Sequence, residues 1–77
     1  MTNLEKYENA FIECIGVTRE QLDGLEYQAN GWDSTGHMSL IAVLEEAFDI
    51  MMDTEDIIDF SSFEKGKELL GKYDVEF

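Results

Sequence analysis

The stretch DSTGHMSLIAVLEEAFDI, which runs from Asp33 to Ile50, decides the fold class of this chain. Asp33 and Ser34 are both strong N-cap residues, so a helix is expected to begin at one of them and to run to about Asp49. The stretch has no proline, and its apolar residues recur at steps of three and four, which is the spacing of a helix. We therefore expect a helix of about four turns here.

The helix expected over 33–49 is apolar on more than one face. At roughly 100° per residue, two stripes run along it. The stripe that we assign to the core consists of Leu40, Leu44, Ala47, Phe48 and Met51. The second stripe starts at the serine of the helix start and consists of Ser34, Met38, Ile41, Ala42 and Glu45. A purely structural bundle does not need the second stripe, whereas a docking surface with an apolar centre and a charged rim does.

The residues before this helix predict another helix and a long connection. Thr2 and Glu5 form the pattern of a capping box, and Gly16 is a typical C-terminal stop, so a first helix is expected between them. The connection over 17–32 is too long for a plain turn between two helices, which indicates a functional role.

The residues after it predict two more helices. A short helix opens at Asp53 or Thr54, and the last helix has the capping-box pattern of Ser61 and Glu64. The tail over 74–77 is expected to fray. The expected fold is all-α: a small four-helix bundle with three main helices, one short third helix and a long first loop.

Length and charge limit the number of domains and the kinds of partner that the chain can bind. With 77 residues, the chain is expected to form a single domain over 1–77 with a thin core. Its 18 acidic and 5 basic residues give a formal net charge of −13. Nucleic acid and anionic membranes are therefore poor partners, because phosphate contacts need Lys and Arg. A basic protein surface is the natural partner.

Cysteine usage and hydropathy give further expectations. Cys14 is the single cysteine, so an internal disulfide is excluded, and no Cys/His cluster indicates a metal site. The first residues have neither a basic segment nor a long apolar run, so no signal peptide is expected. The longest apolar stretch is too short to span a bilayer, and we expect a cytoplasmic protein without membrane insertion.

Ser34 is the candidate for a chemical role in the stretch from Asp33 to Ile50. Backbone N–H groups point outward at a helix start, and the helix dipole favours negative charge there. A phosphate ester on the Ser34 hydroxyl would therefore be stabilised. An Asp-Ser pair before an apolar helix is also a common N-cap, and these two residues alone favour that structural interpretation.

From Asp33 to Phe63 the chain closely resembles the acyl carrier proteins without a gap. The family signature Leu-Glu-Glu-x-Phe-x-Ile stands here as LEEAFDI, Leu44 to Ile50. The similarity continues through DTEDIIDFSSF, over 53–63, which resembles the third helix and the start of the fourth. Together with the acidic composition and the length, the resemblance extends over essentially the whole chain.

The resemblance implies that Ser34 is the attachment point of 4′-phosphopantetheine, transferred from coenzyme A by a separate phosphopantetheinyl transferase. Asp33 would help to position that enzyme and its metal ion. The arm's thiol would carry an acyl or aminoacyl group as a thioester, so the protein is expected to be a monomeric carrier without catalytic residues or a metal of its own. Loading ligases, acyltransferases and synthases with basic patches would dock on Met38, Ile41, Ala42, Glu45, Glu46 and Asp49.

Three residues depart from the pattern of many acyl carrier proteins. Thr35 stands where leucine often follows the serine, Ser39 where an acidic residue is frequent, and Trp32 where a smaller residue precedes the aspartate. The pattern Asp-Ser-x-Gly also resembles D-alanyl carriers and some polyketide carriers. The alternatives are therefore a D-alanyl or other aminoacyl carrier, or an interaction module with the carrier fold that is never modified, because Thr35, Gly36 and Trp32 alter the recognition site. The cargo and its pathway stay open: fatty acid, polyketide, D-alanine or a surface polysaccharide.

Each of three more residues has two candidate roles. His37 could contact the phosphate of the arm, but a solvated residue of the first turn is the favoured interpretation. Trp32 packs on the arm or a partner, or else it anchors the long connection, and the sequence does not decide between these roles. Cys14 is expected to be a buried small hydrophobic residue rather than a reactive thiol.

Overall fold

The computed structural model describes residues 2–77, so Met1 of the expected domain lies outside the described residues. The helices are α1 (Asn3–Ile15), α2 (Ser34–Phe48), α3 (Thr54–Asp59) and α4 (Phe63–Gly71), and a short 3₁₀ helix, η1 (Arg19–Gln21), lies in the first connection. The described residues contain no strand beyond one isolated bridge between Glu26 and Ser62. The prediction of a small all-helical bundle with a short third helix is confirmed.

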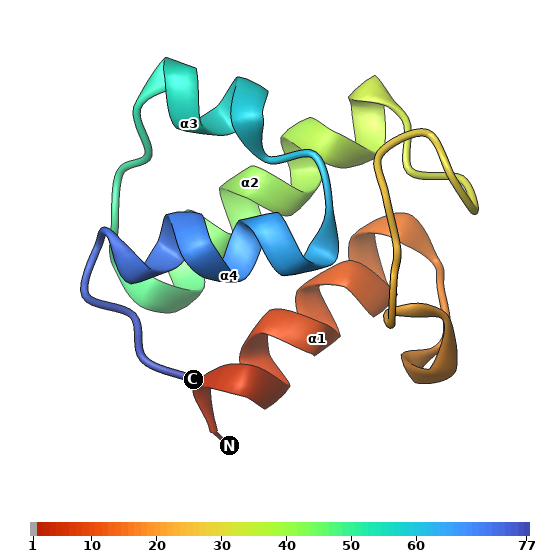
Figure 1. Cartoon of the computed structure of the whole chain (residues 1–77), viewed down its shortest axis with the longest axis horizontal. Coiled ribbons are helices and arrows are strands. Elements are labelled where there is room, and N and C mark those ends of the chain that lie inside the picture. Colours follow the sequence, from red (N-terminus) through yellow and green to blue (C-terminus); the bar gives the residue numbers. More distant parts are fainter. Residues whose placement is uncertain (1) are drawn as a thin grey trace.

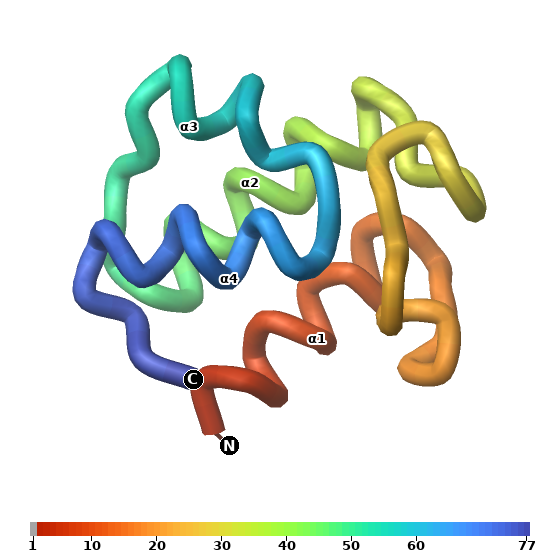
Figure 2. The backbone as a smooth tube through the Cα atoms, viewed as in Figure 1, coloured from red at the N-terminus to blue at the C-terminus, as the bar shows by residue number. Residues whose placement is uncertain are grey.

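The helices are arranged around one aromatic core. In Figure 1, α4 lies between α1 and α3 in the view, with α2 behind it. Figure 2 follows the long connection away from α1, along one end of the bundle and back to the start of α2. Within residues 2–77, no helix has the length and apolar character that crossing a membrane requires.

Side-chain caps explain where the first two large helices begin. The Glu5 amide donates to the Thr2 hydroxyl at 3.1 Å, and the Thr2 amide donates to the Glu5 carboxylate at 3.2 Å. These two bonds form the predicted capping box of α1, which ends at Gly16 with φ of 86°. The Gly36 amide donates to Asp33 Oδ1 at 2.8 Å, so Asp33 is the N-cap of α2.

The start of α4 differs from the prediction by one residue. Its N-cap is Ser62, whose hydroxyl accepts a hydrogen bond from the Lys65 amide at 2.9 Å. The predicted capping box of Ser61 and Glu64 is therefore wrong. The two neighbouring serines are equally good caps, and the bridge between Glu26 and Ser62 favours an extended backbone at Ser62.

The core is built mainly from rings contributed by α1, the long connection and the segment from α3 to α4. Tyr7 and Phe11 are fully buried, and the Tyr7 hydroxyl donates to the Phe63 carbonyl oxygen at 2.5 Å. Gly66 of α4 lies directly against Tyr7 and Phe60, and a Cβ atom at this position would overlap with both rings. The absence of a side chain at Gly66 therefore sets how closely α4 approaches the rest of the core.

The C-terminal tail packs against the first helix. Val75 is buried, and the Phe77 ring lies 5.1 Å from the Tyr7 ring. The Asn3 side-chain amide donates to the Glu76 carbonyl oxygen at 2.9 Å. The expectation that 74–77 frays is therefore wrong, because apolar side chains in this segment reach the core and a side chain of α1 binds its backbone.

A polar cluster fastens α3 to the end of α4. Asp56 of α3 is buried, and its carboxylate accepts hydrogen bonds from Lys72 Nζ at 2.7 Å and from the Tyr73 hydroxyl at 2.6 Å. The Tyr73 hydroxyl in turn accepts from the Asp53 amide at 2.9 Å. The bonds from Lys72 and Tyr73 lower the pKa of Asp56 below its ordinary value of 3.8.

We expect the Asp56→Asn variant to be less stable than the native chain by an amount that depends on pH. Because the pKa of Asp56 is lower in the folded state, its contribution is fully present above the unfolded value of 3.8 and is lost as the pH falls through the folded value. The difference in the free energy of unfolding should therefore be largest near neutral pH and should shrink below about pH 4. Urea unfolding across this range measures it.

The control for this prediction is Asp59→Asn, an exposed carboxylate on the same helix. Its effect should be small at every pH, since exposed charges contribute little to stability. A deficit of Asp56→Asn that stays constant down to low pH would contradict the assignment of the cluster.

Candidate functional site

The start of α2 presents a serine to the solvent. Ser34 is the first residue of the helix and is exposed, as is its neighbour Asp33. The Asp33 side chain caps the helix through Gly36, whereas none of the hydrogen bonds within residues 2–77 involves the Ser34 hydroxyl. The hydroxyl therefore lies accessible at the positive end of a helix of 15 residues.

His37 points into the protein, and the interpretation as a solvated residue is wrong. Its side chain is nearly buried, with 9% exposed. Trp32 Nε1 donates to His37 Nδ1 at 3.1 Å, and His37 Nε2 lies 2.8 Å from the Ile57 carbonyl oxygen. An indole N–H can only donate, so Nδ1 is the acceptor and Nε2 carries the proton that is donated to Ile57. His37 thereby connects the long connection, α2 and α3.

Trp32 anchors the long connection, which decides between the two roles considered for it. The side chain is fully buried and its ring centroid lies 5.2 Å from that of Phe11 and 6.0 Å from that of Phe60. The imidazole of His37 lies edge to edge with it, joined by the hydrogen bond from Nε1, with a centroid distance of 5.8 Å. A residue enclosed in this way does not contact an arm or a partner directly.

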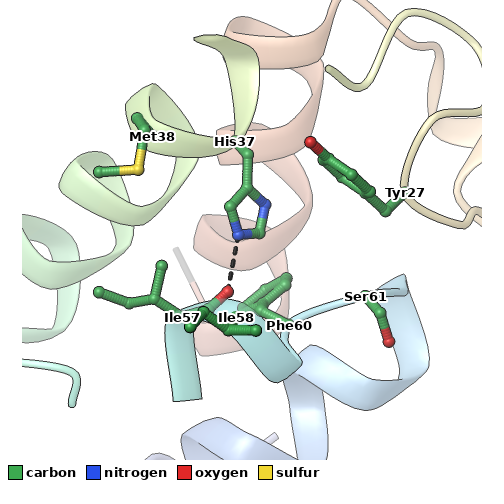
Figure 3. A pocket seen from close by; sticks show the side chains of 7 residues that line it. All are labelled: Tyr27, His37, Met38, Ile57, Ile58, Phe60 and Ser61. Atoms are coloured by element: carbon green, nitrogen blue, oxygen red, sulfur yellow. Dashed lines mark hydrogen bonds between the residues drawn. The ribbon is translucent and has the colours of Figure 1, made fainter. Parts of the chain in front are cut away.

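A pocket of about 320 Å³ opens between α2 and α3, beside the long connection. The residues that line it are Tyr27, His37, Met38, Ile57, Ile58, Phe60 and Ser61. In Figure 3, His37 lies at its centre, with Met38 on one side and Tyr27 on the other. Met38 and Ile58 are 59% and 74% exposed, so they form the mouth. Met38 follows Ser34 by about one turn of α2, which places the mouth next to the exposed serine.

The sequence interpretation missed the pocket residues of α3, although a signal was present. Ile57 and Ile58 are neighbours, and successive residues of a helix point about 100° apart. Two adjacent isoleucines on a helix of six residues are a signal for an apolar surface beside the core. In the structure Ile57 packs against the core and Ile58 is 74% exposed.

The predicted docking residues divide into two groups. Met38, Ala42, Glu46 and Asp49 are exposed as expected. Ile41 is only 2% exposed and belongs to the core, so its assignment to a docking surface is wrong. Glu45 is half-buried, and its carboxylate accepts a hydrogen bond from the Met52 amide at 2.9 Å, so it closes the turn after α2.

The inner face of α2 is turned toward Ile41 relative to the predicted core stripe. Its buried residues are His37, Leu40, Ile41 and Leu44. Two members of the predicted stripe, Ala47 and Met51, are exposed. The hydrogen bonds of His37 explain the rotation, because they hold a polar residue on the inner face and bring its i+4 neighbour inward with it.

Cys14 is half-buried and packs against the core, and burial, followed by the nearby Glu13 carboxylate, raises the pKa of its thiol above 9.0. This environment disfavours the reactive thiolate. In the described part of the chain, no group of three or more His, Cys, Asp or Glu residues is placed to hold a metal ion.

Comparison of this chain with protein-family models, with curated proteins and with solved structures found no match. The functional argument therefore rests on the residues and the geometry of the chain itself.

Proposed function

We propose that this protein is an acyl carrier protein, in which Ser34 bears a 4′-phosphopantetheine arm that carries an acyl or aminoacyl group as a thioester. The observation that supports this most is the placement of the exposed Ser34 at the start of α2, one turn from the mouth of an apolar pocket. When bound, the arm supplies a thiol. The chain supplies the attachment point and a sheltered site for the group that the thiol carries.

The residues around Ser34 fit a phosphate ester. The serine hydroxyl is exposed and makes no hydrogen bond within residues 2–77 that would have to be broken. The N-terminus of α2 favours a negative charge by about 0.3–1 kcal/mol. Asp33 is exposed beside it and would meet the modifying transferase and its metal ion.

The surface of the chain fits partner enzymes with basic patches. The exposed side chains of α2 combine apolar Met38 and Ala42 with acidic Glu46 and Asp49, and the net charge of the chain is −13. Opposite charges steer such an encounter and make its rate depend on salt. We propose a cytoplasmic monomer that acts with a phosphopantetheinyl transferase, a loading ligase, and acyltransferases or synthases, and that is not itself an enzyme.

The test is the intact mass of the protein after incubation with coenzyme A and a broad-specificity phosphopantetheinyl transferase. We expect the native chain to gain one phosphopantetheine unit, located on Ser34, and the Ser34→Ala variant to gain none. Ser39→Ala, another exposed serine of α2, is the matched control and should be modified like the native chain. An unchanged native mass, or a gain that persists in Ser34→Ala, would contradict the proposal.

One argument for the alternative, an interaction module that is never modified, does not hold. Trp32 suggested an altered recognition surface, but its side chain is buried in the core and is not part of the surface around Ser34. An aminoacyl cargo such as D-alanine remains the alternative within the carrier function, because a small cargo of that kind also suits a pocket of about 320 Å³.

A further inference from the structure

The geometry points to His37 as the residue that limits the length of the acyl group the pocket between α2 and α3 can hold. The pocket is thereby restricted to short acyl groups. The biological meaning of this inference rests on the proposed carrier function, whereas the depth of the pocket is a property of the folded chain and is tested separately.

His37 closes the space between α2 and α3 in the direction of the core. Its Nε2 donates across the gap to the Ile57 carbonyl oxygen at 2.8 Å, so the imidazole itself spans the two helices. Figure 3 shows this bond crossing the middle of the pocket, with Met38 and Tyr27 on opposite sides of it. A chain entering past Met38 therefore meets the imidazole rather than a channel that continues between the helices.

In the direction of the core, buried rings close the space behind His37. Trp32 and Phe60 are 0% and 1% exposed, and their ring centroids lie 5.8 and 5.9 Å from the imidazole. The Tyr27 ring adds a third wall at 5.4 Å. The pocket is open outward on both sides of the imidazole, between Met38 and Ile58 on one side and along Tyr27 and the exposed Ser61 on the other, and a longer chain would lie in water there.

Displacing the imidazole is unfavourable because both of its nitrogens are engaged. If His37 moved aside, the Trp32 indole N–H and the Ile57 carbonyl group would be left without their partners in a largely buried place. Each additional methylene that enters an apolar pocket strengthens binding only about fourfold. One or two further methylenes therefore do not offset the loss of two buried hydrogen bonds.

The volume of the pocket agrees with a short cargo. At about 320 Å³, it lies near the lower end of the roughly 300–1,000 Å³ that ligand pockets occupy. A pocket of this size suits a thioester with a short acyl chain better than one with a long chain.

The test uses free acyl thioesters of N-acetylcysteamine with acetyl, butyryl, hexanoyl and octanoyl groups. Each is titrated into the unmodified full chain, and the methyl resonances of Met38, Ile57 and Ile58 are followed by NMR. We expect the affinity to rise about fourfold per methylene for the short members and then to stop rising. A rise that continues to octanoyl, or no response of these methyl groups to any thioester, would overturn the inference.

Two variants assign the limit to His37. In His37→Ala the limit should move to longer chains, because the ring that closes the pocket is gone. In His37→Gln it should stay as in the native chain, because the Gln amide can donate to the Ile57 carbonyl group and accept from the Trp32 N–H. An unchanged limit in His37→Ala would show that another residue closes the pocket. If His37→Ala does not fold, the native series alone still decides whether the length limit exists.

The two proposals can fail separately. The free thioesters do not require a modified Ser34, so a chain that gains no mass with the transferase can still show the length limit. A chain that is modified at Ser34 can equally bind long and short thioesters in the same way, which would leave the carrier function intact and remove the role of His37.

Discussion

Replacing Trp32 with alanine is expected to lower the free energy of unfolding by about 3–5 kcal/mol, the range for deleting a large buried aromatic side chain. Trp32 is fully buried, contacts Phe11 and Phe60, and holds the end of the long connection against the start of α2. At about 0.05–0.15 kcal/mol per residue, a chain of this length has only about 4–12 kcal/mol in total. The variant should therefore be partly unfolded well below the temperature at which the native chain unfolds.

Urea unfolding followed by far-UV circular dichroism measures this loss, with Trp32→Phe as the matched variant. Phenylalanine keeps most of the ring packing but has no N–H group for His37 Nδ1. Its expected cost is about 1–3 kcal/mol, as for a buried acceptor that loses its partner. A cost for Trp32→Ala no larger than that for Trp32→Phe would show that the hydrogen bond, and not the ring, dominates.

Replacing Gly66 with alanine is expected to lower the free energy of unfolding by about 2–3 kcal/mol, through overpacking of the core. The added Cβ would overlap with the Tyr7 hydroxyl and with the Phe60 ring, which are both buried. Any shift of Tyr7 also weakens its hydrogen bond to the Phe63 carbonyl group. This cost exceeds the gain of about 1 kcal/mol that alanine brings to a helix interior.

Gly71 provides the control on the same helix. A Cβ at Gly71 would meet no atom within 4 Å, and the residue is exposed at the last position of α4. Gly71→Ala should therefore be neutral or stabilising by up to about 1 kcal/mol. Thermal unfolding of the two variants side by side separates helix propensity from steric overlap, and equal effects at both glycines would contradict the packing argument.

Helix boundaries were predictable because local chemistry sets them. The capping box of Thr2 and Glu5, the N-cap at Asp33 and the stop at Gly16 each depend on a few neighbouring residues. The prediction was wrong at Ser61 for the same reason, since the adjacent Ser62 is an equally good cap locally. Backbone contacts with a segment distant in sequence distinguish the two serines, since the Tyr27 amide donates to the Ser61 carbonyl oxygen and the bridge joins Glu26 to Ser62.

The orientation of α2 was less predictable because its sequence is apolar around much of its circumference. The pattern permitted a core stripe through Ala47 and Met51, and the structure buries Ile41 instead. A polar residue on the inner face, His37, contributes to this choice through hydrogen bonds to Trp32 and Ile57. These contacts join three separate segments, so no local pattern contains them.

In the candidate site, too, the local feature was predictable from the sequence and the feature that depends on packing was not. The sequence pointed to Ser34 at a helix start, and the structure places it there with its hydroxyl exposed. The pocket beside it depends on how α3 packs against α2 and the long connection, and the sequence did not predict it. Glu45 illustrates the difference within one surface, because its predicted partner was another protein and its observed partner is the Met52 amide.

The position of Trp32 also gives the protein an intrinsic fluorescence signal next to the pocket. It is the only tryptophan in the sequence, and its indole Nε1 is hydrogen-bonded to the imidazole that forms the wall of the pocket, with the ring centroids 5.8 Å apart. Indole fluorescence responds to the hydrogen bond at Nε1 and to a neighbouring imidazole. The emission of the unlabelled protein therefore reports what happens at His37, so entry of a ligand can be followed in a cuvette, at low protein concentration and in real time.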